Sequence, residues 1–331
     1  MIEINFDAKS KDFLLFFRWN EPDLETVRRL PVRAWDKEKK VWRVPENAIF
    51  SLDAIFAQWS DFALERKKYL KDKLLSLVDL KFKNGEERTT VAGTVLRNYQ
   101  AVGVDFLSTA KQGILADDMG LGKTIQSIQT LIGLGTRKNL ILCPATLKWN
   151  WRQEFQKHFG IEPVIIAGNA AKRKELWNSD NKYVIANYEI LQHDWNVLPK
   201  KWDAIVLDEA VYVKNHKSVR AKLAKKLKSD IRIALTGLPM ELHLMEFHSI
   251  FDWAVPGLLP SVYKFKYRYC NFDPFGKIIG YKNVDELHLL TSPFLLRRTK
   301  REVEKELPEK IIIDVPLEFS DEAERYYKQL A

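Results

Sequence analysis

Eight consecutive residues, Asp117 to Thr124, have the types and spacing of a loop that binds phosphate groups. The segment reads Asp-Asp-Met-Gly-Leu-Gly-Lys-Thr and stands between an apolar run typical of a strand and an amphipathic run typical of a helix. Backbone N–H groups at a helix N-terminus bind anions through their geometry and the helix dipole. The sequence predicts that Lys123 reaches the β- and γ-phosphates and that the Thr124 hydroxyl holds Mg²⁺. The rest of the predicted cofactor-binding loop is Asp118, Met119, Gly120, Leu121 and Gly122.

This loop departs at one position from the strict pattern G-x-x-x-x-G-K-T, because Asp117 stands where the first glycine is expected. A second acidic motif supports the interpretation. Asp208 and Glu209 follow the apolar run Ile205-Val206-Leu207, which is typical of a Walker B strand. We expect Asp208 to bind Mg²⁺ through its water shell and Glu209 to polarise the attacking water. Lys123, Asp208 and Glu209 are therefore the predicted catalytic residues, with ATP and Mg²⁺ as cofactors.

Alternating strands and helices must position these motifs. After residue 90, short apolar runs alternate with helical patterns, which indicates βαβ units around a parallel sheet. The helix after the first strand places Ile125, Ile128 and Ile132 on one face and is expected to end near Gly133 or Gly135. Ligands of such sheets bind at the carboxyl ends of the strands. The predicted strands are Gly113 to Ala116, Asn139 to Cys143, Pro163 to Ala167, Tyr183 to Ala186, Ala204 to Leu207 and Arg232 to Leu235.

The first 85 residues have a different pattern, which predicts a small α+β module. Phe13 to Trp19 reads as a strand, Asn20 as a helix N-cap, and residues 30–45 as a hairpin with a tryptophan on each arm. Residues 46–75 are expected to be largely helical, and Lys83 to Arg88 is the best linker candidate. We therefore expect three parts: the module at 1–85, an ATP-binding lobe at 90–255, and a helical extension at 256–331.

The amino-acid composition and net charge indicate a class of partner and exclude several classes of protein. The 331 residues carry a net charge of +9 with a pI near 9.2, which favours an acidic partner such as nucleic acid. Two distant cysteines, Cys143 and Cys270, exclude a disulfide framework and a cysteine-rich zinc site. No apolar run is long enough to cross a membrane, and the acidic start argues against a signal peptide. We expect an intracellular protein: cytoplasmic in a prokaryote or a virus-infected cell, or nuclear.

Several ordered motifs resemble the Swi/Snf-type ATPases of helicase superfamily two, over roughly residues 90–315. Leu96-Arg97-Asn98-Tyr99-Gln100 precedes the phosphate loop as in that family. The resemblance implies a RecA-like P-loop sheet with helices on both faces and DNA-stimulated ATP hydrolysis, in roles such as DNA repair and chromatin remodelling. The further matching segments are Ile141 to Lys148 with Trp151 (motif Ia), Ala186 to Glu189 (Ib), Leu235 to Glu241 (III), and Phe294 to Lys300 with Leu307 to Lys310 at the exit of the lobe.

The resemblance also implies roles for single residues. Arg97 and Gln100 would contact the adenine, while Lys148 and Asn187 would face the backbone of one DNA strand. Lys148 has an ordinary alternative as a solvated lysine. In this family a second RecA-like lobe supplies arginine fingers, each worth roughly 10³–10⁵ in turnover. We therefore expect slow hydrolysis at best without that lobe, whether it is supplied in cis or in trans.

The N-terminal segment resembles the HARP domain of annealing helicases through a shorter pattern, Leu30-Pro31, Arg33, Trp35-Asp36, Lys40, Trp42 and Val44-Pro45. That resemblance implies that Arg33, Trp35, Trp42 and Arg43 stack on or grip branched DNA. The alternative is that both tryptophans form the core of a small domain. A second basic stretch, Lys214 to Arg232, is either a solvated helix face, with Val219, Leu223 and Leu227 turned inward, or a surface that tracks phosphates.

Three residues depart from the family pattern close to the chemistry. Val211, Leu238 and Leu242 replace the usual polar His, Thr and Asn. One hypothesis is that nucleotide binding survives while coupling to DNA is weakened, and the other is drift within a subgroup. The overall prediction is the ATP-binding half of a DNA-dependent translocase that remodels or reanneals double-stranded or branched DNA. The alternative is a non-catalytic, nucleotide-gated module that binds DNA or a partner.

Overall fold

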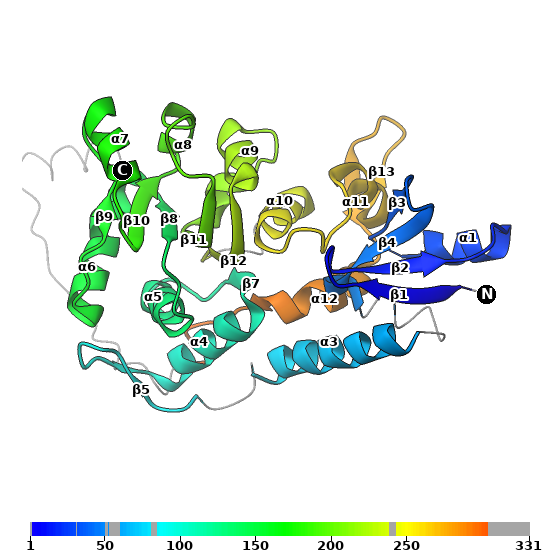
Figure 1. Ribbon diagram of the computed structural model, residues 1–331, viewed down its shortest axis with the longest axis horizontal. Coiled ribbons are helices and arrows are strands. Elements are labelled where there is room, and N and C mark those ends of the chain that lie inside the picture. The colour runs from blue at the N-terminus through cyan, green and yellow to red at the C-terminus, as the bar shows by residue number, and fades with distance from the viewer. Residues whose placement is uncertain are drawn as a thin grey trace, which may run out of the picture.

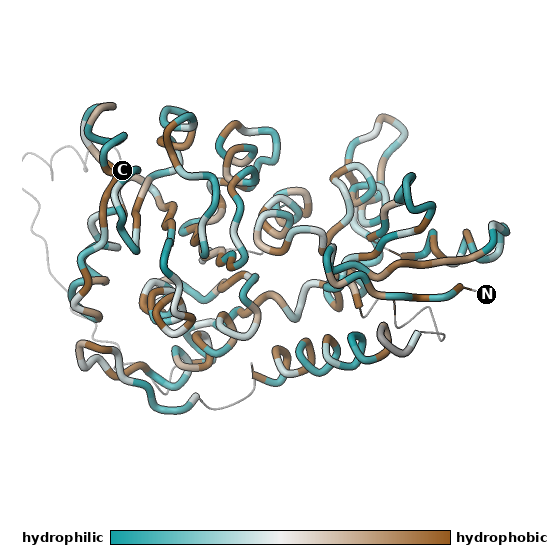
Figure 2. The backbone as a smooth tube through the Cα atoms, viewed as in Figure 1, coloured by the Kyte–Doolittle hydropathy of each residue, from teal (hydrophilic) through white to brown (hydrophobic). Residues whose placement is uncertain are grey.

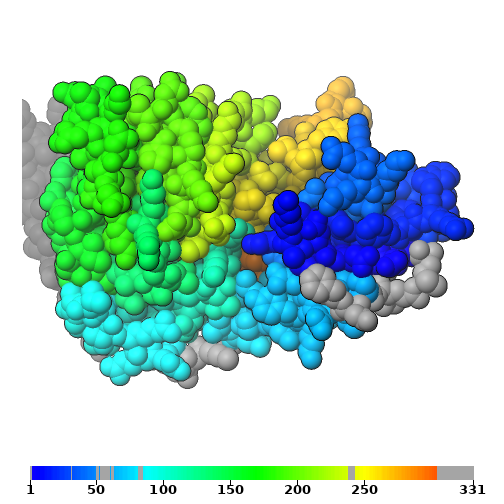
Figure 3. All heavy atoms as spheres, viewed as in Figure 1, coloured from blue at the N-terminus to red at the C-terminus, as the bar shows by residue number. Residues whose placement is uncertain are grey.

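The computed structural model describes residues 2–30, 32–49, 52, 60–80, 85–237 and 243–303, with the backbone alone at residues 61 and 62. A large lobe with a central sheet lies beside a small N-terminal module, and one long helix runs beneath the module (Figure 1). In the space-filling view, the module, the helix and the lobe pack together along a continuous surface (Figure 3). The predicted α/β fold is confirmed.

The lobe is built on a seven-stranded sheet whose neighbouring strands all pair in parallel. Strand β8 (Asn139–Cys143) is buried along its whole length, and β11 (Lys201–Leu207) and β12 (Lys228–Leu235) are buried over their C-terminal halves, as expected for strands covered on both faces. In spatial order the strands are β15 (Leu295–Leu296), β7 (Gln112–Leu115), β12 (Lys228–Leu235), β11 (Lys201–Leu207), β8 (Asn139–Cys143), β10 (Tyr183–Asn187) and β9 (Val164–Ile165).

Helices cover both faces of this sheet. On one face α4 (Asn98–Ala110), α5 (Lys123–Gly133) and α6 (Lys148–Phe159) pack side by side, and on the other lie α8 (Ile190–His193), α9 (Val219–Lys226) and α10 (Leu244–Ala254) (Figure 1). A further helix, α7 (Ala170–Asn178), follows β9. Helix α5 buries Ile125 and Ile128 as its periodicity predicts, and Gly135 with φ of 65° follows its end. This arrangement confirms the expected RecA-like P-loop sheet with helices on both faces.

Strand register brings the predicted motifs to one edge. Leu235 of β12 pairs with Leu115 of β7, and Leu207 of β11 pairs with Ala234 of β12. The strand before the phosphate loop and the strand before the acid pair therefore flank β12 and end at the same level. Residues that follow these strands share the carboxyl edge of the sheet, where ligands of parallel α/β folds bind.

The N-terminal module is an antiparallel sheet with the order β1-β2-β4-β3 and one helix. Its elements are β1 (Glu3–Asp7), β2 (Asp12–Phe16), α1 (Glu21–Arg28), β3 (Ala34–Asp36) and β4 (Val41–Pro45), with a short 3-10 turn at Glu46–Ala48. Asn20 caps α1, since its side chain accepts the amide of Asp23 at 2.8 Å. The predicted hairpin is also present, because Trp35 and Trp42 are directly paired across β3 and β4.

Helix α3 (Asp61–Leu80) joins the two bodies, since it contacts both β1 of the module and α4 of the lobe. Alternating hydrophobic and hydrophilic bands run along it (Figure 2). The expectation of a largely helical stretch over 46–75 agrees with the described part of that range, which begins with the 3-10 turn and ends within α3. Residues 50, 51 and 53–59 lie outside the described residues. A two-stranded ladder, β5 (Arg88–Thr89) with β6 (Val95–Leu96), then leads into α4.

The segment after residue 255 is only partly helical. It contains α11 (Val262–Tyr269), the hairpin β13 (Cys270–Phe272) with β14 (Ile278–Tyr281), and α12 (Val284–Thr291). A 3-10 turn at Ser292–Phe294 then leads into β15, which joins the edge of the lobe sheet beside β7. A two-residue strand carries too little periodicity to be predicted, so its long-range pairing was missed. Residues 304–331, including the motif at Leu307, lie outside the described residues.

The basic stretch after Lys214 corrects one prediction. Val219 at the start of α9 is 51% exposed, and the inward face is formed instead by Ala221 and Ala224. Leu227 is buried, but Lys228 already belongs to β12. Small alanines let α9 lie close to the lobe, a packing effect that a search for large apolar residues misses. Within the described residues, no helix is long and apolar enough to cross a membrane.

Candidate nucleotide-binding site

The phosphate loop connects β7 to α5 and takes two left-handed turns. Gly120 has φ of 85° and Gly122 has φ of 75°, conformations that a side chain would strain. Gly122 is the N-cap of α5, so the first amides of that helix point out of the loop with their dipole. A Cβ on Gly122 would also lie 2.5 Å from Gln100 Nε2, so only glycine lets Gln100 pack here. Backbone amides, a helix N-terminus and close approach fit a bound phosphate chain.

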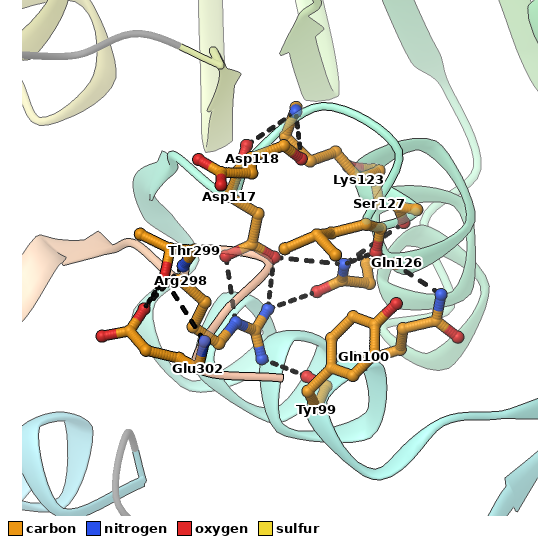
Figure 4. Close-up of polar contacts among 12 residues, drawn as sticks. Tyr99, Gln100, Asp117, Asp118, Lys123, Gln126, Ser127, Arg298, Thr299 and Glu302 are labelled. Carbon is orange, nitrogen blue, oxygen red and sulfur yellow. Dashed lines mark hydrogen bonds and ion pairs between the residues drawn. The ribbon is translucent and has the colours of Figure 1, made fainter. Parts of the chain in front are cut away.

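Lys123 is the first residue of α5, and its ammonium lies back over the loop. Lys123 Nζ donates to the carbonyl oxygens of Asp117 at 2.8 Å and Asp118 at 3.2 Å (Figure 4). Burial lowers the pKa of Lys123, and the nearby carboxylates, Asp117 foremost and then Glu209 and Asp208, oppose that shift. The ammonium is thus desolvated and surrounded by negative groups, as expected for a cation that binds phosphate.

The rest of the loop surrounds this lysine. Thr124 follows it in the first turn of α5 and is half-buried, while Leu121 is fully buried beneath the loop. Met119 is 58% exposed and packs against Gly237, where a Cβ would lie 3.2 Å from Met119 Cγ and 4.0 Å from Lys123 Nζ. Gly237, which follows β12 and belongs to the predicted motif III, is therefore directly beside the phosphate loop.

Asp208 lies at the end of β11 and is held from three sides. Its Oδ2 accepts the indole N–H of Trp151 at 2.7 Å, and its Oδ1 accepts the amide of Glu209 at 3.0 Å. The fully buried Tyr188 donates its hydroxyl to the Asp208 carbonyl at 2.7 Å. Burial raises the pKa of Asp208, although Trp151, the Glu209 amide and Lys123 each act to lower it. No arginine or lysine forms an ion pair with this carboxylate among the residues described.

Glu209 follows in a left-handed conformation, with φ of 49° and ψ of 62°. Strain of this kind at a residue other than glycine persists where the surrounding structure enforces it. Burial and the neighbouring Asp208 charge raise the pKa of Glu209. Asp208 thus offers Mg²⁺, which favours oxygen ligands, a carboxylate that no described ion pair neutralises, and Glu209 stands beside it with a raised pKa. In the described part of the chain no group of three His, Cys, Asp or Glu side chains could hold a metal, so the predicted ion would rely on phosphate oxygens and water as well.

The residues predicted to contact adenine lie at the start of α4. The amide of Arg97 donates to Gln100 Oε1 at 3.0 Å, and Gln100 Nε2 donates to the Leu121 carbonyl at 3.4 Å. Gln100 therefore connects the start of α4 to the phosphate loop. Its carboxamide is held by backbone groups on both sides, at the position expected for the nucleotide.

A buried ion pair, which was not among the predicted site residues, lies beneath the loop. Arg298 donates to both carboxylate oxygens of Asp117, with Nε–Oδ1 at 2.9 Å and Nη2–Oδ2 at 2.5 Å (Figure 4). Asp117 is completely buried and Arg298 is 8% exposed. This pairing explains why an aspartate stands at the first position of the phosphate loop.

The residues predicted to face DNA follow two neighbouring strands. Lys148 begins α6 after β8, and its Nζ donates to the Ile166 carbonyl at 3.4 Å. Asn187 ends β10, and its Nδ2 donates to Glu189 Oε2 at 2.8 Å. Both side chains are half-buried at the carboxyl edge of the sheet, on the strands beyond β11.

The two tryptophans of the module have different environments. Trp35 is 47% exposed, whereas Trp42 is half-buried against the core, and their rings lie 5.4 Å apart. Arg33 is half-buried, donates to the Leu30 carbonyl, and has its pKa lowered by burial and by nearby arginines such as Arg268. The module therefore presents one indole face and one partly desolvated cation, at a distance along the chain from the nucleotide site.

Of the three departures from the family pattern, only Val211 lies within the described residues. It is half-buried in the 3-10 turn Ala210–Val213 that follows Glu209. Its neighbour Tyr212 stacks on Tyr188 with ring centroids 5.2 Å apart. Leu238 and Leu242 lie outside the described residues.

Sequence reasoning missed the residues that support the site from behind. Trp151 was identified only as part of motif Ia. It stands 57 residues before Asp208, and no local pattern in the sequence indicates a hydrogen bond between the two residues. Gln126 is fully buried on the inward face of α5, where a polar residue among isoleucines is a signal that was available. Arg298 follows a short edge strand 181 residues after Asp117, and no local pattern reveals such a pairing.

Comparison with known proteins agrees with this geometry. The model of the SNF2-related domain matches residues 99–331, more than half of the chain. An uncharacterized ATP-dependent helicase of Mycoplasma pneumoniae is 34% identical over 305 residues, which cover 86% of this chain and 28% of the relative. The uncharacterized ATP-dependent helicase MG018 of Mycoplasma genitalium is 38% identical over 245 residues, covering 70% and 23%. The chain thus spans about a quarter of the length of these two relatives.

A solved structure is also similar. The SWI2/SNF2 ATPase core of Sulfolobus solfataricus in complex with dsDNA aligns with a TM-score of 0.56 and 33% identity, covering 62% of this chain and 44% of that one. The matched family region includes the phosphate loop, the acid pair and Arg298. The chain therefore belongs to the SNF2-related family of ATPases in helicase superfamily two.

Proposed function

We propose that this chain is the ATP-binding lobe of a DNA-dependent ATPase that remodels or reanneals DNA. One observation carries the proposal: Lys123, Asp208 and Glu209 meet at the carboxyl edge of one parallel sheet, in the segments that follow the two strands flanking β12. Family membership and the similarity to an ATPase core in complex with dsDNA support the same function. In this proposal the lobe spans residues 90–255, the module residues 1–85, and residues 256–331 continue from the lobe.

Each residue has a part that follows from its surroundings. Loop amides and Lys123 would hold the phosphates, and Thr124 and Asp208 would hold Mg²⁺, which shields negative charge and orients the terminal phosphate when bound. Glu209 would orient the attacking water and accept its proton, since its raised pKa makes it a better base than an ordinary glutamate. Arg97 and Gln100 would contact the adenine from the start of α4.

DNA binding and full turnover involve groups outside the nucleotide site. Lys148 and Asn187 stand at the same edge as the nucleotide residues, where a DNA backbone would lie close to the hydrolysis site. We propose that double-stranded or branched DNA binds there, and that a second RecA-like lobe in cis or in trans completes the catalytic machinery with an arginine finger, which contributes about 10³–10⁵ in rate.

The test is the ATPase rate with and without forked DNA, for this chain alone and with a second lobe supplied. Stimulation by DNA that needs the second lobe, and that Lys123→Ala abolishes, supports the proposal. Lys174→Ala is a matched control, because this exposed lysine of α7 lies outside the site and should leave the rate unchanged. ATP turnover that is equal in Lys123→Ala and the wild type would contradict the proposal.

For the module we propose a HARP-like role in binding branched DNA through Arg33, Trp35 and Trp42. The half-exposed indole of Trp35 supports this, because exposed aromatic rings stack on unpaired bases. Trp35→Ala should weaken binding to a forked DNA by about 1–3 kcal/mol. Affinity unchanged in that variant would instead favour a purely structural role for the tryptophan pair.

A second candidate function rests on Val211, an apolar residue beside the catalytic acids at a position where the family usually has a polar one. Under it, the chain binds ATP and changes its contacts with DNA or a partner without turnover. The double variant Val211→His with Leu238→Thr distinguishes this candidate function from the DNA-dependent ATPase. Increased DNA-stimulated turnover in the double variant supports the hypothesis that these apolar residues weaken the coupling of hydrolysis to DNA in the wild type. An unchanged rate contradicts that hypothesis.

A further inference from the structure

The segment 295–303 returns to the phosphate loop and forms hydrogen bonds along its length. Ala116 N donates to the Leu296 carbonyl at 2.7 Å, and Asp118 N donates to the Arg298 carbonyl at 2.9 Å. Lys300 N then donates to Asp118 Oδ2 at 2.9 Å. The ladder between β7 and β15 thus continues past the end of both strands and into the loop itself.

Side chains strengthen this connection inside the core. Arg298 Nη2 donates to Gln126 Oε1 at 2.9 Å while its guanidinium binds Asp117 (Figure 4). Gln126 Nε2 in turn donates to the carbonyls of Leu121 at 3.1 Å and Gly122 at 3.2 Å. Arg298 therefore contacts the first residue of the loop directly and the last residues through Gln126.

The backbone of Asp117 and Asp118 also holds the side chain of Lys123. Its ammonium donates to the Asp117 and Asp118 carbonyls, and both residues are fixed by the segment that carries Arg298. A movement of that segment would shift these carbonyls and, with them, the lysine that binds phosphate. Placement errors of about 1 Å cost enzymes roughly 10²-fold in rate.

Space around the network is also limited. A Cβ on Gly103 of α4 would lie 1.8 Å from Gln126 Oε1 and 3.0 Å from Arg298 Nη2. Glycine in the middle of a helix costs stability relative to alanine, so this position serves the close approach and not the helix. A single methyl group here would displace the network without removing any charge.

We infer that Arg298 is a positioning residue for the phosphate loop, and that the network of Arg298, Asp117 and Gln126 couples nucleotide binding to the seating of segment 295–303. This inference rests on the proposed function, because it needs the loop to bind ATP. Coupling of this kind is reciprocal: nucleotide that binds the ordered loop stabilises the seated segment, and the seated segment raises nucleotide affinity by the same factor.

The test separates positioning from stability. Replacing both charges by apolar residues of similar size, as in Asp117→Leu with Arg298→Met, often leaves stability intact. The Tyr99 carbonyl and Gln126 Oε1 lose a donor in this double variant, so we expect a modest fall in its thermal midpoint. Below that midpoint we expect the folded variant to bind a fluorescent ATP analogue at least about tenfold more weakly. Arg298→Lys keeps the charge but loses the bidentate geometry, so we expect partial recovery relative to Arg298→Met alone.

A matched control exists elsewhere in the lobe. Arg173 binds Asp194 through both oxygens, with Nε–Oδ2 and Nη2–Oδ1 at 2.9 and 2.8 Å, far in sequence from the loop. Asp194→Leu with Arg173→Met should leave nucleotide affinity unchanged. If the first double variant fails to fold, Gly103→Ala gives the same readout with all charges kept, and we expect it to weaken the analogue about tenfold.

Hydrogen exchange supplies a readout that would not change if Arg298 had a structural role alone. In the wild type, ATP should slow exchange at the amides of 295–303 about tenfold, and the double variant should lose that protection at saturating ATP. Wild-type affinity in Asp117→Leu with Arg298→Met, or no protection of the segment in a wild type that binds ATP, overturns the inference. A wild type that binds no ATP overturns the proposed function itself.

Discussion

Two aspartates of the lobe have nearly the same surroundings and opposite electrostatics. Asp194, which follows α8, is 5% exposed and accepts the indole N–H of Trp177 at 2.9 Å. Asp208, at the end of β11, is 8% exposed and accepts the indole N–H of Trp151 at 2.7 Å. The difference is an arginine: Arg173 binds both oxygens of Asp194, whereas among the described residues the cation that acts on Asp208 is the partly buried Lys123.

This difference decides the sign of each pKa shift. Burial raises the pKa of both carboxyls, but Arg173 and Trp177 together bring the pKa of Asp194 below its ordinary value. The pKa of Asp208 stays raised. A carboxylate used for structure is thus neutralised within the fold, and one available for chemistry is left short of positive charge. Asp117, paired with Arg298, belongs to the first kind although it lies in the phosphate loop.

The largest expected effect separates the two aspartates by activity. Asp208→Asn removes the proposed metal ligand and should lower DNA-stimulated ATPase activity about 10²–10³-fold. Its stability should change by less than about 1 kcal/mol, because the lost acceptor and the relief of a buried charge oppose each other. Steady-state ATPase assays and urea unfolding measure the two effects. Full activity in Asp208→Asn would contradict the assignment.

The reverse pattern is expected for Asp194→Asn. Here the half-buried Arg173 loses the charge of its partner, so the free energy of unfolding should fall, and by more than in Asp208→Asn. The ATPase rate at a temperature where the variant is folded should equal that of the wild type. A loss of activity without a loss of stability would show that this corner of the lobe also contributes to function.

Tryptophan variants give an intermediate effect. Trp151→Phe removes the hydrogen bond that helps to keep Asp208 ionised, so we expect the acidic limb of the ATPase pH profile to move to higher pH and activity to fall about tenfold. Trp177→Phe removes the equivalent bond at Asp194 and should leave the profile in place. Profiles recorded in parallel for both variants test the pair, and an equal shift in the two would remove the distinction.

The smallest effect concerns the pH dependence of stability. Because the folded pKa of Asp208 is raised above 3.8, the wild type loses stability as pH rises from that value through the folded pKa. Asp208→Asn lacks the titrating group, so its stability rises relative to that of the wild type over the same pH window. Asp194 behaves oppositely, since its lowered pKa gives stability above 3.8 that is lost as pH falls. Urea midpoints of both variants between acidic and neutral pH should diverge in opposite directions. Parallel curves would show that neither carboxyl is perturbed.

Local patterns predicted the reactive part of the lobe well. Strand β8 was predicted with its observed bounds, and the left-handed glycines of the phosphate loop follow from its motif. Periodicity and turn residues are properties of neighbouring positions, so one sequence suffices to find them. Asp208 could be placed at a strand end for the same reason.

Long-range partners could not be predicted in this way. Whether an aspartate receives an arginine depends on which segments meet in space, and Asp117 and Arg298 are 181 residues apart. The same limit hid β15 and the contact between Trp151 and Asp208, 57 residues away. Helical spacing placed Val219 on one face with Leu223 and Leu227, and the close packing of two alanines reversed that expectation for Val219.

The most direct measurement is the Mg²⁺ dependence of nucleotide affinity. A fluorescent ATP analogue is titrated into the wild type, Asp208→Asn and Asp194→Asn, each with Mg²⁺ and with a chelator. We expect Mg²⁺ to tighten binding about tenfold or more in the wild type and in Asp194→Asn, and to have little effect in Asp208→Asn. An undiminished Mg²⁺ effect in Asp208→Asn would contradict the claim that this carboxylate is left unpaired in order to hold the metal.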